Sequence, residues 1–413
     1  MTLLVDHMNN KNKLNRSLSL PLITFFGLGN ILGAGIYVLV GKVAGEAGYF
    51  APLAFFIASV VAAISAFTYA ELSARYPVSA GEAIYLDEGL NIRVLTIGVG
   101  LLIAIAGMVS TSALAHGFAG YLSVFIDLPS WLIIASVIIF LGGLAIWGVG
   151  VSVMVAAIFT VIEIIGLVIV VVLGGDYIAT TDLQLSSKAF DISAMSWAGV
   201  FSAAFLAFYA YLGFEDMVNV AEEVKEPEKN MPRAIIIALL VSTLLYSLVS
   251  IVAVLVIEPQ QLAASDAPLA DVYQKITDKK PVLLTVIGLF AVINGALIQI
   301  IMSSRLLYGM SKNGWLPRFL SDVNPKTNTP IASTVLVVMT ILILSLLFHL
   351  VFLAQITSYI VLSVFALVNL SLIKIKSSNP HPENVKVYSP WIPVAGLLTT
   401  VLFILIEISN QLF

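Results

Sequence analysis

The sequence predicts an all-α polytopic membrane protein, and two observations indicate this fold class. Of its 413 residues, 60% are hydrophobic and only 11% are charged, a composition that soluble globular domains do not reach. The apolar residues also gather in runs, and each run approaches or exceeds the roughly 20 residues that a helix needs to cross a bilayer. We therefore expect a bundle of membrane helices without a separate soluble domain.

Eleven apolar runs divide the chain into predicted membrane helices. Proline residues mark several of the joints between them, as at Pro77, Pro129 and Pro281. The two longer connections, 175–195 and 258–280, have room for short helices at the membrane interface. The runs lie at about 17–41, 50–74, 93–125, 130–148, 150–174, 196–221, 232–257, 281–311, 330–348, 353–374 and 390–411.

The basic residues predict how the chain is oriented. With the N-terminus inside, fifteen of the 20 Lys and Arg residues lie in inner segments and five lie outside, in line with the positive-inside rule. We therefore expect a cytoplasmic tail at 1–16, an extracellular loop at 175–195 and an extracellular C-terminus. The absence of cysteine excludes disulfides, thiolate zinc sites and cysteine nucleophiles.

Four glycines crowd the middle of the first run: Gly27, Gly29, Gly33 and Gly35. Each lowers helix stability by about 1 kcal/mol relative to Ala in a soluble helix, and Gly33-Ala34-Gly35 is the weakest point. The helix can therefore be interrupted there. Gly29 and Gly33 also have the four-residue spacing that lets two membrane helices pack closely, so both interpretations stay open.

An interruption at this depth would create a site for a zwitterion. The N–H groups near Gly35 and Ile36 would start a second half-helix and attract a carboxylate. The freed carbonyls near Asn30 and Ile31 would attract an ammonium group. Because hydrocarbon cannot satisfy such groups, they must line a cavity or meet a ligand.

A second irregularity lies in the run at 196–221. Gly213 stands among four aromatic residues, and the carboxylates Glu215 and Asp216 follow it at once. Acidic groups inside a span are costly and usually face a cavity, although the apolar helix could instead end near Gly213 and leave the acids at the interface. The aromatic residues are Phe208, Tyr209, Tyr211 and Phe214.

The two irregular runs are five helices apart, and five is an odd number. A repeat of five helices therefore runs antiparallel to its partner, and interrupted helices at matching positions of inverted halves are typical of a transporter site at the midplane. We expect the two halves at 17–174 and 196–376. An inner loop and an eleventh helix would occupy 377–413.

Several polar residues interrupt other apolar runs. Glu163 has apolar neighbours for two turns on each side, so it must bind a proton or cation, or be a neutral structural group. Asn294 and Gln299 suit either a pocket or hydrogen bonds between helices. In the third run, His116 is more often a hydrogen-bonded filler than a proton relay, and Thr111 belongs to a small polar patch.

Five stretches in order along the chain resemble the amino acid–polyamine–organocation (APC) superfamily of permeases, which share the leucine-transporter fold. Together they cover roughly residues 17–370, and any one stretch alone would be weak evidence for the resemblance. They are Gly-Asn-Ile-Leu-Gly-Ala-Gly-Ile-Tyr at 29–37, Tyr-Ala-Glu-Leu-Ser-Ala-Arg-Tyr-Pro-Val-Ser-Ala-Gly-Glu-Ala-Ile-Tyr at 69–85, Tyr-Leu-Gly-Phe-Glu at 211–215, Glu-Val-Lys-Glu-Pro-Glu-Lys-Asn-Met-Pro-Arg-Ala-Ile at 223–235 and Arg-Leu-Leu-Tyr-Gly-Met-Ser-Lys-Asn-Gly-Trp-Leu-Pro at 305–317.

The resemblance implies a 5+5 inverted repeat with discontinuous helices 1 and 6, and transport by alternating access. It implies that the substrate carboxylate meets N–H groups of Ala34, Gly35 and Ile36, and that the amine meets carbonyls near Asn30, Ile31 and Phe208. It further implies a gating role for Tyr209, side-chain-pocket positions for Thr111 and Gln299, and an inner-gate role for Glu215. The substrate-binding set that we predict is Asn30, Ile31, Gly33, Ala34, Gly35, Ile36, Thr111, Phe208, Tyr209, Tyr211, Gly213 and Gln299, with Glu163 and Glu215 for proton or cation coupling.

Two features depart from that family. Many relatives carry a lysine where this chain has Glu163, at the place of a coupling sodium ion in other members of the fold. Relatives usually have twelve helices, whereas this chain has eleven, which puts dimers formed through the last two helices in doubt. The coupling ion and the oligomeric state therefore stay open.

We expect a plasma-membrane secondary transporter that takes up neutral L-amino acids with protons, because little fixed charge stands near Thr111 and Gln299. The alternatives are an exchanger or Na⁺-coupled symporter of the same fold, and a non-transporting amino acid sensor or complex subunit. An ion channel is a weaker alternative, because the sequence shows no ring or repeat of filter residues. Enzyme and phosphate-loop motifs are absent, and we expect no cofactor, no metal and no nucleic acid partner.

Overall fold

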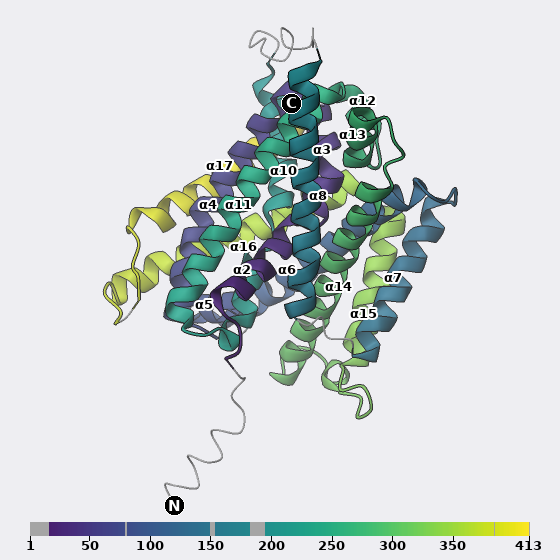
Figure 1. Ribbon diagram of the computed structural model, residues 1–413. Helices are drawn as coiled ribbons and strands as arrows, with labels where there is room; N and C mark the ends of the chain where they lie inside the picture. Colours follow the sequence, from purple (N-terminus) through teal and green to yellow (C-terminus); the bar gives the residue numbers. More distant parts are fainter. Residues whose placement is uncertain (1–15, 79–80, 149–152, 182–194, 384, 413) are drawn as a thin grey trace, which may run out of the picture.

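The computed structural model describes residues 16–78, 81–148, 153–181, 195–383 and 385–412, and over these residues the regular structure is helical (Figure 1). Each of the eleven predicted runs is a helix or a pair of half-helices, so the fold class is confirmed. Within the described residues, nine segments are long and apolar enough to cross a membrane; the first, Leu20–Arg75, spans two of the predicted runs. The predicted tail up to residue 15 and the part of the outer loop at 182–194 lie outside the described residues.

The first predicted interruption is confirmed at Gly33. Helix α2 (Leu20–Leu32) ends there and helix α3 (Ala34–Ala47) begins directly after it. Gly33 has φ −38° and ψ −136°, a combination outside the helical region, so the i to i−4 ladder breaks at this residue. The break is one residue long, so the second half-helix begins at the residue directly after Gly33.

The second predicted interruption is longer. Helix α10 (Trp197–Phe208) passes into the 3₁₀ turn η3 (Tyr209–Tyr211), and the chain becomes extended at Leu212, with ψ 145°. Gly213 follows with φ 125°, a value that side chains rarely tolerate. The second half continues as the 3₁₀ helix η4 (Glu215–Glu223), so the predicted acids belong to a half-helix.

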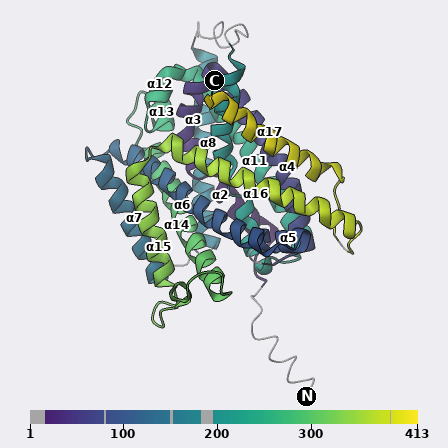
Figure 2. The same ribbon diagram turned by 180° about the vertical axis from the view of Figure 1, so that it is seen from behind.

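The remaining spans surround these two interrupted helices. They are α4 (Ala51–Arg75), α6 (Arg93–Ser123), α7 (Ser130–Trp147), α8 (Val153–Thr180), α11 (Pro227–Val256), α14 (Val282–Lys312), α15 (Ile331–Leu347), α16 (Leu350–Ser378) and α17 (Trp391–Leu412), with short 3₁₀ turns η1 (Gly48–Phe50) and η5 (Arg318–Ser321). Figure 2 shows α16 and α17 running obliquely across the back of the bundle.

Three short helices mark the two faces of the bundle. Helices α12 (Pro259–Ala264) and α13 (Pro268–Thr277) lie on one face and confirm the short helices predicted in the 258–280 connection. Helix α5 (Gly81–Leu90) lies on the other face and was not predicted. We call these the α12 face, which also carries the end of α17, and the α5 face, which carries the start of α2.

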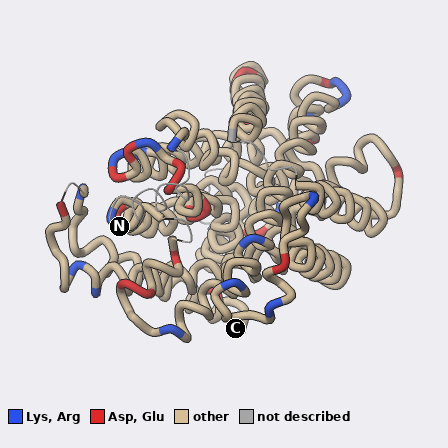
Figure 3. Tube along the Cα trace, turned by 90° about the horizontal axis from the view of Figure 1, so that it is seen from below, with Lys and Arg blue, Asp and Glu red and all other residues tan. Residues whose placement is uncertain are grey.

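Charged side chains are few in the bundle. Figure 3 views the molecule from the side of the N-terminus, and most of the chain is neither acidic nor basic. The charged stretches are short and separated, as the low charge content of the sequence requires. This distribution suits helices that cross a bilayer and connect at its surfaces.

The segment that contains α12 and α13 covers the ends of α3 and α6 at the α12 face. A Cβ atom added to Gly41 in α3 would lie 2.2 Å from the Leu262 carbonyl oxygen, and one added to Gly120 in α6 would lie 2.2 Å from that of Asp266. Lys42 also donates to the Ala263 carbonyl at 2.6 Å. The segment therefore packs directly on both helices.

A buried ionic cluster holds the α5 face together. Glu71, at the end of α4, pairs with Arg75 and with Lys376 of α16, each at 2.8 Å. It also accepts from the Tyr388 backbone N–H at 2.9 Å, and Lys376 donates to the Tyr388 carbonyl at 2.6 Å. The cluster thus joins α4, α16 and the segment that leads to α17.

Candidate functional site

The two interruptions are in direct contact. A Cβ atom on Gly35 would lie 2.5 Å from Ala210 Cα, and one on Gly213 would lie 2.6 Å from the carbonyl carbon of Asn30. Glycine is therefore required at both positions, because any side chain would force the two segments apart. The predicted proximity of the two breaks follows from this packing.

The glycines of the first run divide the two roles that the sequence left open. A Cβ atom on Gly29 would lie 2.2 Å from Thr160 Oγ1 of α8, so Gly29 serves close helix packing. Gly33 instead supplies the interruption. Packing and interruption therefore coexist in one helix, four residues apart.

The backbone groups at the breaks are unequally satisfied. The Tyr246 hydroxyl of α11 lies 2.5 Å from the Ile31 carbonyl and 2.9 Å from the Ala210 carbonyl, so the Ile31 oxygen, which we expected to be free for an ammonium, already has a donor nearby. The N-cap residue of α3 is Gly33, which has no side chain to cap the first turn. The positive end of that half-helix is thus not neutralised by its own N-cap residue.

Asn30 adds a polar group at the same place. Neither its Oδ1 nor its Nδ2 has a hydrogen-bond partner among the described residues, and both atoms are buried. A buried, unpaired amide costs free energy unless a ligand or water meets it. Asn30 therefore places two unpaired polar atoms beside the first interruption.

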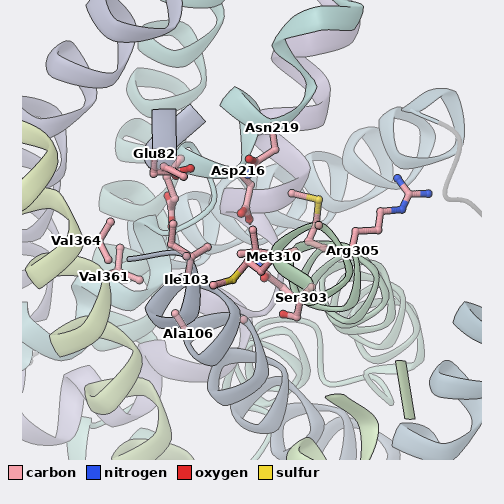
Figure 4. Close-up of a pocket in the computed structure, with 18 of the residues that line it drawn as sticks. Glu82, Ile103, Ala106, Asp216, Asn219, Ser303, Arg305, Met310, Val361 and Val364 are labelled. Atoms are coloured by element: carbon pink, nitrogen blue, oxygen red, sulfur yellow. The ribbon is translucent and has the colours of Figure 1, made fainter. Parts of the chain in front are cut away.

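A cavity of about 480 Å³ lies beside the second interruption (Figure 4). It extends from Ser110 and Thr357 in the middle of the bundle to Asn313 and Trp315, beyond the end of α14 on the α5 face. Leu212, in the extended part of the break, contributes to its wall. Apolar side chains cover much of the rest, among them Ile103, Ala106, Met310, Val361, Val364 and Phe365.

One end of the cavity is acidic. Asp216 accepts a hydrogen bond of 2.8 Å from Gln299, and Glu215 accepts one of 2.8 Å from the Gly213 backbone N–H. Arg305 also lines the cavity, but its exposed side chain extends away from Glu82 and Asp216 (Figure 4). The acids are therefore not paired with this arginine.

Glu82 joins this acidic end from α5, outside the membrane-spanning helices. Its side chain is only 3% exposed. Burial raises the pKa of Glu82 to about 8, an effect that its own backbone N–H opposes and the negative charge of Asp216 reinforces. At neutral pH this carboxyl therefore retains its proton in the folded protein.

The predicted residues divide into those that line the cavity and those that do not. Glu215 and Gln299 line it, whereas none of the residues Asn30–Ile36 is among the described residues of its wall. Thr111 is 1% exposed and donates to the Gly107 carbonyl at 2.8 Å. Its neighbour Ser110 lines the cavity instead.

The predicted aromatic residues form the packing around the second break. The Tyr209 hydroxyl lies 3.0 Å from Ser110 Oγ and donates to the Ser110 carbonyl at 3.1 Å, which links the interrupted helix to α6. Phe208 packs against Phe365 of α16, with ring centroids 6.0 Å apart. Tyr211 packs against Tyr246 at 5.1 Å, so both rings are structural here.

Glu163 lies in a separate buried site between α8 and α14. Its side chain is fully buried, with Oε1 3.5 Å from Asn294 Nδ2. Glu163 Oε2 and Asn294 Oδ1 have no hydrogen-bond partner among the described residues. The Tyr37 hydroxyl of α3 donates to the Glu163 carbonyl at 2.7 Å. A carboxyl with one free oxygen beside an amide oxygen can hold a proton or coordinate a small cation.

Sequence reasoning missed two groups of this site. Glu82 was seen only as part of a motif. Tyr246 gave no local signal, because its two partners lie in other helices. Asp216 was named with Glu215 among the acids expected to face a cavity, and both line it.

Comparisons with known proteins agree with the resemblance. The Amino acid permease family matches residues 18–413. The branched-chain amino acid permease BcaP of Bacillus subtilis (strain 168) is 28% identical over 98% of this chain and 90% of its own length. The vacuolar cationic amino acid transporter 4 of Arabidopsis thaliana is 31% identical over 78% of this chain. The human cationic amino acid transporter 4 is 26% identical over 91% of this chain. The chain spans 57% of the plant protein and 62% of the human one.

Proposed function

Because the chain belongs to the amino acid permease family, whose members are transporters and not enzymes, we propose that it is a secondary active transporter for amino acids that works by alternating access. One observation carries the proposal: two interrupted helices meet at Gly35–Ala210 and Asn30–Gly213, beside a cavity that extends to the α5 face. Paired broken helices at a midplane site are the structural basis of this kind of transport.

The proposal includes an orientation in the plasma membrane. The α5 face is cytoplasmic and the α12 face is extracellular, so the N-terminus lies inside and the C-terminus outside. The five-helix halves at 17–174 and 196–376 form the inverted repeat, and 377–413 adds α17. With the α12 face closed and the cavity reaching the α5 face, this structure corresponds to an inward-facing state.

The substrate is held by its two ends. Its carboxylate meets N–H groups of Ala34, Gly35 and Ile36 at the start of α3, and its ammonium meets carbonyls near Asn30 and Phe208. Because Gly35 now packs against Ala210, binding there requires the two breaks to separate. Tyr209, which links the break to α6, is placed to move in that step.

Neutral L-amino acids are the first substrate class that we propose. The apolar wall of the cavity supports it, since Ile103, Val361 and Phe365 would bury an aliphatic side chain. BcaP, which is similar over 98% of this chain, carries the name of a branched-chain amino acid permease.

Cationic amino acids are the second substrate class, and a specific observation favours them. We expected little fixed charge near Gln299, but Asp216 lies 2.8 Å from it and lines the same cavity. A carboxylate there would favour a basic side chain. Two of the relatives named above are called cationic amino acid transporters.

Proton-coupled uptake through Glu163 is the coupling that we propose, with Na⁺ coupling or exchange as the second possibility. The free Glu163 Oε2 and the nearby Asn294 Oδ1 support both. The absence of a Lys or Arg ion pair to Glu163 among the described residues favours the proton. A buried carboxyl without a cationic partner is more stable in its neutral form.

Uptake by the purified full chain in proteoliposomes tests this function. Radiolabelled leucine, valine, lysine and arginine are each supplied under an imposed H⁺ gradient, an imposed Na⁺ gradient, or neither. We expect one class to accumulate above its outside concentration only with the H⁺ gradient. Saturable binding without accumulation or exchange of any of them would instead favour a sensor.

A further inference from the structure

A buried carboxyl lies on the eleventh helix, which stands outside the two five-helix halves. Glu407 is 1% exposed and is the only charged residue of α17. The opposite side of that helix is apolar and exposed, with Leu398, Leu402 and Leu405 each more than half exposed. A carboxyl buried in a span is costly and is usually retained for a role.

Glu407 links three helices at the α12 face. Its Oε2 accepts a 2.9 Å hydrogen bond from the Ser202 hydroxyl of α10. Its Oε1 lies 3.5 Å from the Gln355 amide of α16 and accepts a 3.0 Å hydrogen bond from Gln411 of its own helix. One turn on, Asn410 donates to the Ala198 carbonyl of α10 at 3.3 Å.

Aromatic contacts continue this link along α10 to the interruption. Phe403 of α17 packs against Phe205 and Phe208, with centroids 5.5 and 6.3 Å apart. Phe205 packs in turn against Tyr359 of α16 at 4.5 Å. Phe208 is the last residue of α10. The contacts between α17 and α10 therefore extend to the start of the second interruption.

Helix α10 is also connected to the closure of the α12 face. A Cβ atom on Gly199 in α10 would lie 2.7 Å from the Glu46 carbonyl at the end of α3. The neighbouring Gly45 packs in the same way against Ala263 of α12. Movement of α10 therefore has to displace the contacts that close this face.

We propose that Glu407 is a positioning residue for transport, which fixes the half-helix α10 against α16 through the eleventh helix and so stabilises the state closed at the α12 face. The inference rests on the proposed function, because it assigns the opening of that face to the transport cycle. Its three donors come from uncharged side chains, so removing the carboxylate breaks the link between helices without leaving a cation unpaired.

Cysteine accessibility tests the proposal, since the native chain has no cysteine. One reporter is Ala267→Cys, at a residue that is 5% exposed between α12 and α13. The other is Gly309→Cys, which lines the cavity toward the α5 face and has no atom within 4 Å of an added Cβ. Each is placed in the full chain in proteoliposomes, and its rate of reaction with a maleimide is measured.

We expect Glu407→Leu and Ser202→Ala to raise labelling of the Ala267→Cys reporter at least threefold and to lower labelling of the Gly309→Cys reporter. Glu407→Gln keeps the length of the side chain, and its hydrogen-bond partners can rotate to meet an amide. Its labelling rates should therefore stay close to those of the native protein. Gln411→Ala is the matched control, because it removes only the bond within α17. Its labelling rates should stay native.

Unchanged rates in both Glu407→Leu and Ser202→Ala would overturn the proposal, and so would equal increases at both reporters, which indicate general loosening. If Glu407→Leu fails to fold, the labelling rates of Ser202→Ala, which is a smaller change, still test the proposal. The labelling rates are measured without any transport of an amino acid. If no amino acid alters labelling in the native background, the proposed function fails, whereas the role of Glu407 is judged by the variants alone.

Discussion

Gly35 and Gly213 are the residues on which contact between the two interruptions depends. Gly35 has no room for a Cβ atom against Ala210, and Gly213 combines a positive φ with close approach to Asn30. Gly35 was predicted from the local density of glycine in an apolar run, and Gly213 from its place among aromatic residues directly before two acids. The partner of each was not, because Ala210 and Asn30 lie about 180 residues away along the chain.

Gly35→Ala and Gly213→Ala should each lower the free energy of unfolding by about 1–3 kcal/mol, since the added methyl group overlaps backbone atoms. Amino acid uptake should also fall, and by more than the loss of folded protein explains. The reason is that the added methyl group would push the two interrupted segments apart. Gly98→Ala is the control, because an added Cβ there meets no atom within 4 Å. Native uptake in both variants, measured at matched protein levels, would contradict the role of this contact.

Glu163 is the residue that couples transport to the gradient in our account. Glu163→Gln keeps the hydrogen bond to Asn294 possible and removes the exchangeable proton. It should abolish accumulation driven by the H⁺ gradient and retain part of the exchange of labelled for unlabelled amino acid. Glu88→Gln, at an exposed residue of α5, controls for the loss of a charge. If Glu163→Gln still concentrates substrate as the native protein does, the coupling group lies elsewhere.

At the scale of elements, the apolar runs and their glycines were sufficient to predict eleven helices and both interruptions. Helix α5 was missed because its ten residues mix apolar and acidic side chains, so it resembles a polar connection. Its burial comes from packing against other helices: a Cβ atom on Gly81 would lie 2.6 Å from Val218 of η4. Such contacts between distant segments leave no local pattern.

The pKa of Glu82 gives α5 a pH dependence. Its usual pKa of 4.5 is raised to about 8 by burial, so folding favours the protonated form. This contribution to stability is complete below pH 4.5 and is lost as pH rises through 8. The Tm of the purified protein should therefore fall between pH 6 and 9, and Glu82→Gln should make that fall smaller. Equal falls in both proteins would contradict the assignment.

The Glu71 cluster gives a prediction for α4, α16 and α17 together. Glu71→Ala leaves Arg75 and Lys376 buried without their carboxylate and should cost about 3–5 kcal/mol. Lys376→Met should cost less, because the Glu71–Arg75 pair remains intact. Thermal unfolding in detergent, followed by size-exclusion chromatography, measures both. A larger loss in Lys376→Met than in Glu71→Ala would be inconsistent with this geometry.

At the scale of the whole molecule, hydropathy predicted the fold class and the placement of Lys and Arg predicted a sidedness. The sequence did not predict which face is closed, because closure depends on how α12 and α13 pack on α3 and α6. The sequence indicated that Glu215 and Asp216 could face a cavity, but it did not predict that Asp216 meets Gln299 across 83 residues. The eleventh helix was predicted as a span, but its buried Glu407 stood near the end of an apolar run and resembled an interfacial residue.

The central claim is that an amino acid separates the two interruptions and is held by their backbone groups. Electron cryo-microscopy of the purified chain with the amino acid that it accumulates tests this most directly. We predict that the substrate carboxylate lies within hydrogen-bonding distance of the N–H groups of Gly35 and Ile36, with Gly35 moved away from Ala210. An amino acid bound only among Glu82, Asp216 and the apolar wall, with Gly35 still packed on Ala210, would contradict the account.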